Sequence, residues 1–539
     1  GYVHLGTCLC KWEMVRTEFY FCFLAEKLFG KFFKLLFSRL CLVGLTILIQ
    51  VILLITLIFY FSNYYFYVYV IFTAISVAAV LWILNDRINP AYKIVWILPI
   101  VVFPMFGGLF YIFFGRNKAS RRTKKKLKRI GSKMAANLHQ SKQVFERLQQ
   151  QDLDASNQAR YLIDYSGCPV FQNTTAEYLK IGEEKFARLC KELEEAKHYI
   201  FLEYFIVQEG VMWNTILEIL VRKVREGVDV RVIYDDVGCL RTLPLGYEKQ
   251  LTALGIQCCV FNPFIPVLST QLNNRDHRKI AVIDGHTAFT GGINLADEYI
   301  NVIERFGHWK DTAIVVQGEA AWSFTVMFLS LWSYLKGTNE NFEQFRPSPQ
   351  SLARFPSSGY VQPYADSPLD YEAVGENVYL NLVGAAQRYV YITTPYLVLD
   401  NEMQTALCNA AKRGIDVRII TPHIPDKWYV HAVTKSNYQI LIESGVKIYE
   451  YLPGFIHGKT FIVDDKFATV GTINLDYRSL YLHFECGVWL YNMNSVFEVK
   501  EDFLQTQKLS QEITLKMCQS VPWYIRLGRS VLRIFAPML

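Results

Sequence analysis

Charged side chains are scarce in this chain of 539 residues: Asp, Glu, Lys and Arg make up 19% of it, whereas hydrophobic residues make up 52%. This balance is too apolar for an ordinary soluble enzyme, so we expect part of the chain to lie in lipid. The chain also lacks the glycine-rich fingerprints of a phosphate-binding P-loop and of a dinucleotide-binding fold. The sequence therefore gives no support to a nucleotide-dependent enzyme.

Twelve cysteines are present, but they form no Cys-x-x-Cys pair and no cluster with histidine. Neither a zinc site nor a disulfide framework is indicated, and we expect free thiols in a reducing compartment. No group of carboxylates has the arrangement of a divalent-metal site. We therefore expect catalysis without a metal and without any other cofactor.

Long uncharged runs lie near the N-terminus. The run 41–60 is long enough to span a bilayer, and the runs 65–84 and 94–114 follow it. Proline and glycine in the third run are tolerated where neighbouring helices satisfy the backbone. We expect an α-helical transmembrane region over 41–115, preceded by an N-terminal extension, 1–40. Whether one of the runs is only re-entrant stays open.

A basic block, 116–130, follows the third run. Such a block beside a span favours the cytoplasmic side and attracts anionic lipid headgroups. We therefore expect a multi-pass protein of the cell membrane whose remaining domains face the cytoplasm, with 116–164 as a juxtamembrane linker. The block lies beside the membrane rather than among aromatic residues, so no nucleic-acid partner is expected.

One pattern, H-x-K-x4-D-x6-G-x2-N, occurs twice with identical spacing. The copies begin at His277 and His457, so they lie 180 residues apart (457 − 277 = 180). The surrounding sequence repeats as well, since REGVDVRVI at 225–233 matches KRGIDVRII at 412–420. Strands alternate with amphipathic helices in both copies, which predicts an α/β fold with two pseudo-symmetric lobes.

The expected lobes are 165–345 and 371–518, joined by a linker rich in Pro and Ser, 346–370. The tail, 519–539, alternates Arg with Trp, Leu and Ile. That pattern is typical of an interfacial amphipathic helix, and an ordinary helix that docks on the catalytic domain is the alternative.

Each motif places a histidine and a lysine two residues apart, so that on a strand both side chains project from one face. These pairs are His277 with Lys279 and His457 with Lys459. A neutral imidazole can attack phosphorus, lysines neutralise the phosphate oxygens, and a second histidine must protonate the departing oxygen. One motif therefore supplies half of a phosphoryl-transfer site, and two facing lobes supply all of it.

The motif asparagines, Asn294 and Asn474, are predicted to donate amide hydrogens to the same phosphate oxygens. Asp284 and Asp464 complete the candidate catalytic set formed by the motifs, although their place near the strand end favours a structural, turn-forming role. The second motif has Gly471-Thr472 where the first has Gly291-Gly292, a departure that we expect to alter none of the proposed contacts.

A histidine base is usually oriented by a carboxylate on its other ring nitrogen. Candidates for this orienting role lie downstream of the motifs, and they are Asp311 and Glu485.

These residues are similar to the doubled His-Lys-Asp signature of the phospholipase D superfamily. Within it, the membrane segment 89–111 and the stretches 294–299 and 474–479 resemble the bacterial cardiolipin synthases. The resemblance covers roughly residues 41–539. It implies two phospholipase D-type lobes, and it implies a phosphatidyltransferase that makes cardiolipin and glycerol from two phosphatidylglycerol molecules. His277 would form the phosphohistidine and His457 would be the acid and base.

Two alternatives stay open. The first is a membrane-bound phospholipase D hydrolase that releases phosphatidic acid, because water and a lipid hydroxyl can resolve the same intermediate. The second is a non-catalytic membrane scaffold, against which two intact motifs argue. The apolar runs disfavour a nuclease of the same superfamily. The order of the two histidines, the acceptor lipid and the oligomeric state also stay open.

Overall fold

The computed structural model describes residues 65–115, 131–263 and 274–538, apart from 353, 358 and 371, and five residues between 48 and 56. Contacts divide the chain into one unit of residues 1–69 with 265–268 and a second unit of 70–264 with 269–539. The second unit holds both motifs. The predicted N-terminal extension, the basic block and most of the run 41–60 lie outside the described residues.

The second and third apolar runs fold as helices. Their bounds are α3 (Tyr65–Asn85), α4 (Pro90–Val102), α5 (Pro104–Phe110) and the π-helix η2 (Tyr111–Gly115). Asn89 caps α4, since its side chain accepts the Ala91 N–H, and proline follows the cap. Among the described residues, no helix combines the length and the apolar character that crossing a bilayer requires. The transmembrane region stays a prediction.

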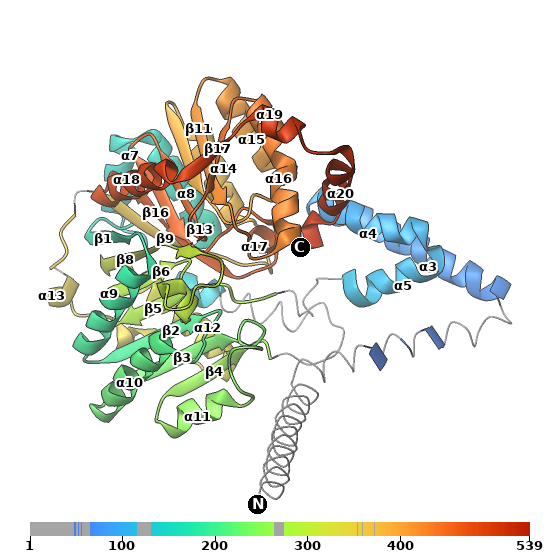
Figure 1. The fold of residues 1–539 in the computed structure, drawn as a ribbon. Helices are drawn as coiled ribbons and strands as arrows, with labels where there is room; N and C mark the ends of the chain where they lie inside the picture. Colours follow the sequence, from blue (N-terminus) through green and yellow to red (C-terminus); the bar gives the residue numbers. More distant parts are fainter. Residues whose placement is uncertain are drawn as a thin grey trace, which may run out of the picture. The chain divides into compact units, whose positions relative to one another are not determined.

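The first lobe, residues 174–345, is built on a seven-stranded sheet of order β1-β8-β6-β5-β2-β3-β4 (Figure 1). Its strands are β1 (Thr174–Leu179), β2 (Tyr199–Tyr204), β3 (Asp229–Asp235), β4 (Gln257–Phe261), β5 (Ile280–Ile283), β6 (Thr287–Gly291) and β8 (Ala313–Gly318). Its helices are α9 (Gly182–Glu195), α10 (Val211–Arg225), α11 (Tyr247–Ala253) and α12 (Ala321–Lys336).

Both faces of this sheet are buried, which explains the continuous apolar runs of its strands. In β2, Ile200 and Leu202 pack with α9 and α10, whereas Tyr199 and Phe201 point to the other face. That second face packs on α12, whose residues from Ala321 to Ser333 are all buried. A helix that is apolar all round belongs in the core, and α12 occupies that place.

The second lobe, residues 360–513, repeats this topology in an eight-stranded sheet of order β17-β12-β11-β10-β14-β15-β16-β9. Its strands are β9 (Tyr360–Asp366), β10 (Tyr389–Thr393), β11 (Asp416–Pro422), β12 (Lys447–Tyr451), β14 (Thr460–Val463), β15 (Phe467–Gly471), β16 (Glu485–Tyr491) and β17 (Ser510–Ile513). Its helices are α14 (Val374–Ala385), α15 (Asn401–Lys412), α16 (Trp428–Glu443) and α18 (Asn494–Lys508). Read from β9, its first seven strands follow the order of the first sheet, which confirms the predicted pair of pseudo-symmetric α/β lobes.

Two boundaries differ from the expected domains. Strand β9 falls inside the stretch predicted as a linker, 346–370, and pairs with β16, so the second lobe begins earlier than its motif pattern indicates. The helices α7 (Lys142–Gln151) and α8 (Leu153–Ser166) lie in the expected juxtamembrane linker. Buried side chains such as Leu148 and Leu162 join these helices to the main core, so this part of the chain is packed protein.

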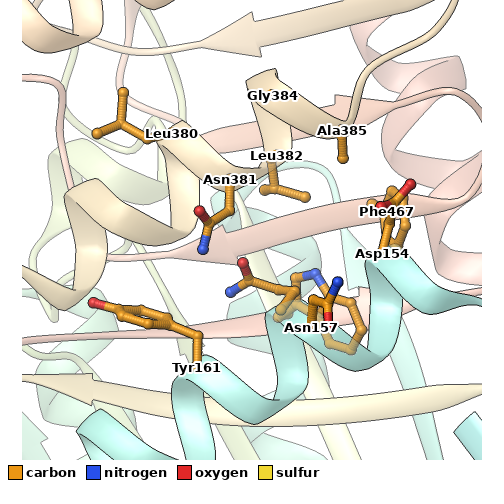
Figure 2. A pocket seen from close by; sticks show the side chains of 11 residues that line it. Asp154, Asn157, Tyr161, Leu380, Asn381, Leu382, Gly384, Ala385 and Phe467 are labelled. Atoms are coloured by element: carbon orange, nitrogen blue, oxygen red, sulfur yellow. The ribbon is translucent and has the colours of Figure 1, made fainter. Parts of the chain in front are cut away.

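A cavity of about 520 Å³ lies between α8 and α14 (Figure 2). Gln158 and Asn381 line it from the two helices, and the side chains of Phe467 and Trp489 line it from the sheet. None of the fixed motif residues lines this cavity, so it is separate from the candidate site described next.

Candidate active site

Short segments exchanged between the lobes bring the two motifs together. Strand β7 (His308–Lys310) of the first lobe pairs in parallel with β13 (Gly454–Ile456), which directly precedes the second motif. The backbone N–H of His457 donates to the Lys310 carbonyl over 2.6 Å. The residue after β7, Asp311, therefore arrives beside a histidine of the other lobe.

The opposite exchange occurs at the first motif. Asp276 forms a parallel bridge with Phe484, and the backbone N–H of His277 donates to the Phe484 carbonyl over 3.0 Å. Glu485, the first residue of β16, is thereby placed beside His277. The pseudo-symmetry of the fold extends to these crossed segments.

Each motif histidine is hydrogen-bonded through Nδ1 to a carboxylate from the other lobe. Nδ1 of His277 lies 2.8 Å from Oε1 of Glu485, and Nδ1 of His457 lies 2.6 Å from Oδ2 of Asp311. Both carboxylates are fully buried. A carboxylate on Nδ1 fixes the tautomer and leaves Nε2 for chemistry. Asp311 and Glu485, the two residues predicted for this role, therefore have the required geometry.

The two carboxylates are held differently. The Thr472 hydroxyl donates to Oε2 of Glu485, whereas the backbone N–H of Thr312 donates to Oδ1 of Asp311 over 2.8 Å. A Cβ at Gly292 would lie 2.0 Å from that same Oδ1, so the position beside Asp311 requires glycine. Thr472 in the second motif, where the first has Gly292, leaves the proposed contact of Glu485 with His277 in place and adds a hydrogen bond to that carboxylate.

The motif lysines are buried beneath the histidines. Nζ of Lys279 donates to the His277 carbonyl over 2.5 Å, and Nζ of Lys459 donates to the His457 carbonyl. Burial lowers the pKa of Lys279 to about 7 and that of Lys459 to about 8, although nearby carboxylates oppose the shift. Both ammonium groups thus carry labile protons near neutral pH, close to where phosphate oxygens would lie.

Both histidines are neutral in this environment. Burial and the Lys459 ammonium together lower the pKa of His457 to about 4, although Asp311 opposes the shift. Burial also lowers the pKa of His277 well below its usual value, with added contributions from Lys279 and Lys459. Because Lys459 belongs to the other lobe, its effect on His277 means that the two motifs share one electrostatic site.

The motif aspartates lie away from this chemistry. Asp284 accepts the backbone N–H groups of three residues, 197–199, and has a φ of 49°. Asp464 accepts those of 387–389 and has a φ of 56°. Each carboxylate ties the turn after its strand to the start of a neighbouring strand. These contacts with the backbone match the structural, turn-forming role predicted for the two aspartates. We therefore remove Asp284 and Asp464 from the candidate catalytic residues.

The motif asparagines are buried and already engaged. Nδ2 of Asn294 donates to the Tyr299 hydroxyl over 2.7 Å, and its Oδ1 accepts the N–H of Ile206. Nδ2 of Asn474 donates to Oγ of Ser479 over 3.1 Å. One N–H of each amide is therefore used within the protein, and a phosphate contact would fall to the second.

Sequence reasoning missed the rings that flank the histidines. The indole of Trp309 lies 5.5 Å from the ring of His457, and the imidazole of His483 lies 5.5 Å from that of His277. These residues occupy matching positions, two before Asp311 and two before Glu485. Aligning the two copies beyond their asparagines is the signal that could have found them.

Comparison with known proteins identifies relatives that cover most of the chain. A family model described as "Cardiolipin synthase, PLD-like domain" matches residues 189–332 and 379–507. A second, described as "Phospholipase_D-nuclease N-terminal", matches residues 74–116. A cardiolipin synthase from Geobacillus kaustophilus is 35% identical over 472 residues, which cover 87% of this chain and 92% of that protein.

Two further relatives extend the comparison. A protein from Streptococcus mutans described as "Uncharacterized protein" is 46% identical over 463 residues, 86% of this chain and all of that protein. The crystal structure of phosphatidylserine synthase from Haemophilus influenzae is similar with a TM-score of 0.52 at 16% identity, over 71% of this chain and all of that chain. At that identity, the likeness concerns the fold.

Proposed function

The chain belongs to the cardiolipin synthases with phospholipase D-like domains, and we propose that it transfers a phosphatidyl group between two phosphatidylglycerol molecules, giving cardiolipin and glycerol. The observation that carries this proposal is the pair of crossed contacts, His277 with Glu485 and His457 with Asp311. Two oriented imidazoles and two buried lysines in one site are what a two-step transfer at phosphorus requires.

In the first step, Nε2 of His277 attacks phosphorus while the bond from phosphorus to the glycerol oxygen breaks. His457, protonated on Nε2, gives its proton to that oxygen, and glycerol leaves. The negative phosphate raises the proton affinity of His457 when substrate binds, which offsets the effect of burial. Lys279 and Lys459 neutralise the phosphate oxygens, and the second N–H of Asn294 and Asn474 adds donors.

In the second step, neutral His457 takes the proton of a hydroxyl on the second phosphatidylglycerol. The hydroxyl oxygen attacks phosphorus, the bond from phosphorus to His277 breaks, and cardiolipin forms. Glu485 stabilises the positive imidazole of the intermediate through Nδ1, and Asp311 does the same for His457. No metal or other cofactor takes part in this scheme.

We also propose that the site works at the surface of an anionic membrane, in a multi-pass protein whose lobes face the cytoplasm. The tail helix α20 (Trp523–Ile534) supports the contact with a membrane surface, because one stripe along it is apolar and exposed. Trp523, Leu527, Val531 and Ile534 lie on this stripe with exposed fractions of 69, 56, 48 and 41%. The neighbouring Leu532 packs on the second lobe, so the helix docks with one face and offers another to lipid.

The test is a vesicle assay with phosphatidylglycerol as the sole lipid substrate, comparing the wild type with His277→Ala and His457→Ala. Cardiolipin and glycerol should form with the wild type and with neither variant. Phosphatidic acid in place of cardiolipin would mean that water is the acceptor, and vesicle binding without any product would favour a scaffold. Phosphohistidine trapped in His457→Ala but not in His277→Ala would support the proposed order.

A further inference from the structure

A third imidazole, which the transfer scheme does not use, lies beside the pair of His277 and Glu485. Nδ1 of His483 lies 3.8 Å from Oε1 of Glu485, and its side chain is only 10% exposed. Neither of its ring nitrogens has a hydrogen-bond partner within the part of the chain that the structure describes. Buried polar groups are nearly always paired, so this ring calls for a physical explanation.

The spacing of the three side chains suits ligands of one ion better than a hydrogen-bonded chain. A separation of 3.8 Å between His483 and Glu485 is too long for a hydrogen bond. Two nitrogen ligands at about 2.1 Å from a tetrahedral zinc ion lie about 3.4 Å apart. One ligand atom from each of His277, His483 and Glu485 lies within 4.8 Å of the other two. Shifts on the order of an ångström would complete the set.

We propose that His277, His483 and Glu485 form a binding site for a divalent transition-metal ion of the zinc class, and that the bound ion inhibits the enzyme. Two imidazoles and one carboxylate are a donor set that zinc, cobalt and copper ions favour. The ion replaces the proton on Nδ1 of His277, which is released to solvent. His277 thereby loses its bond to Glu485 and gains a positive neighbour, so its Nε2 becomes a poor nucleophile.

The other half of the site provides an internal comparison. Trp309 occupies the position that corresponds to His483, and its indole packs on His457 at 5.5 Å. An indole offers no lone pair to a metal ion, so His457 and Asp311 have no third ligand of this kind. The difference restricts the ion to the half that contains His277, the proposed nucleophile.

Nearby positive charge limits the affinity. Lys279 and Lys459 act electrostatically on His277 and repel a dication, whereas Glu485 and Asp311 attract one. We therefore expect binding in the micromolar range, weaker than in structural zinc sites, so that chelators remove the ion readily. Metal binding itself is independent of the proposed transferase activity, whereas the inhibition rests on it.

The first experiment titrates Co²⁺ into the full chain in detergent and records the visible spectrum. We expect the bands of four-coordinate cobalt to saturate at one ion per chain. They should vanish in His483→Gln and persist in His286→Gln, the control, because His286 is bonded to Thr287 and belongs to no such cluster. Equal bands in wild type and His483→Gln would place the ion elsewhere, on a thiol for example, and would overturn the proposal, as would the absence of bands.

The second experiment measures cardiolipin formation at increasing Zn²⁺. The wild type and His286→Gln should be inhibited, and a chelator should restore both. The Zn²⁺ concentration that gives half-maximal inhibition should be at least about tenfold higher for His483→Gln than for the wild type. Equal sensitivity of all three proteins would refute the inhibitory role. A cobalt site in a protein that forms no cardiolipin would instead refute the proposed function and leave the metal site standing.

Discussion

Exchanging each orienting carboxylate for its amide should damage the two halves of the site to very different extents. Glu485 and Asp311 perform the same task, since each accepts a hydrogen bond from Nδ1 of a histidine. Their second oxygens have different partners, a hydroxyl in one case and a backbone N–H in the other. A hydroxyl can turn and a backbone N–H cannot, and this difference sets the size of each effect.

In Glu485→Gln, the amide oxygen can remain on Nδ1 of His277. The Thr472 hydroxyl, which now donates to Oε2, can turn to the Cys486 carbonyl at 3.1 Å and accept from the new amide instead. His277 then keeps its tautomer, and only the charge of its partner is lost. A hydrogen bond to a charged group contributes about 1.5–3 kcal/mol. We therefore expect the rate to fall roughly 10- to 150-fold.

In Asp311→Asn, the backbone N–H of Thr312 at 2.8 Å can only donate, so the amide oxygen must stay on that side. The amide nitrogen then faces Nδ1 of His457 and forces the proton onto Nε2. His457 can no longer act as a base in that tautomer. The corresponding exchange in a serine-protease triad lowers the rate about 10⁴-fold, and we expect a loss of that order here.

The assay is the initial rate of cardiolipin formation from phosphatidylglycerol vesicles, with thermal melting to verify that both variants are folded. Asp311→Asn should lose at least ten times more activity than Glu485→Gln, as the ranges above require. Equal losses of activity, or a larger loss in Glu485→Gln, would refute the argument that the backbone N–H of Thr312 is fixed whereas the Thr472 hydroxyl can turn.

Four further results are expected. Asp464→Asn should lower the melting temperature, because one amide oxygen cannot accept three backbone N–H groups, each worth about 1 kcal/mol; an unchanged melting temperature would contradict the anchoring role. Gly292→Thr should abolish turnover, since its Cβ would lie 2.0 Å from Oδ1 of Asp311; retained turnover would mean that the loop moves freely. Because the pKa of His457 falls to about 4 on folding, the unfolded chain binds the proton first as pH drops below 6.5. The contribution of His457 to stability should therefore be lost between pH 6.5 and 4, so the melting temperature of the wild type should fall more, or rise less, over that range than that of His457→Gln. Leu527→Glu should weaken sedimentation with anionic vesicles while leaving activity in detergent intact; unchanged sedimentation would remove α20 from the lipid surface.

The sequence predicted what depends on local pattern. The doubled motif, the alternation of strands and helices and the repeat at 225–233 and 412–420 led to two α/β lobes, and the two sheets have that shared topology. The motif aspartates occupy odd-numbered steps from the histidines along the strand, which predicted that they point away from the phosphate site. The hydrogen bonds that Asp284 and Asp464 accept from backbone N–H groups agree with this prediction. These features follow from residues close together in the chain, where spacing alone fixes geometry.

The sequence could not predict that each motif histidine pairs with a carboxylate from the other lobe. His277 and Glu485 are 208 residues apart, and His457 and Asp311 are 146 apart. No periodicity links such distant positions, because the first pairing depends on the bridge between Asp276 and Phe484 and the second on how β7 and β13 meet in the folded chain. The sequence predicts Glu485 as an orienting carboxylate, but it does not predict the hydrogen bond that Glu485 accepts from Thr472.

The exchange of carboxylates between the lobes makes the two half-sites depend on each other, although their surroundings differ. Because each histidine takes its carboxylate from the other lobe, neither half-site is complete until both lobes have folded against each other. The histidines and lysines are the same in both halves, whereas the groups around the carboxylates differ: Thr472 against Gly292, and His483 against Trp309. A transfer at phosphorus needs one imidazole as nucleophile and another as acid and base. Because both are histidines, their different neighbours must set the different chemistry of the two side chains. The asymmetry lies beside the carboxylates that hydrogen-bond the two histidines.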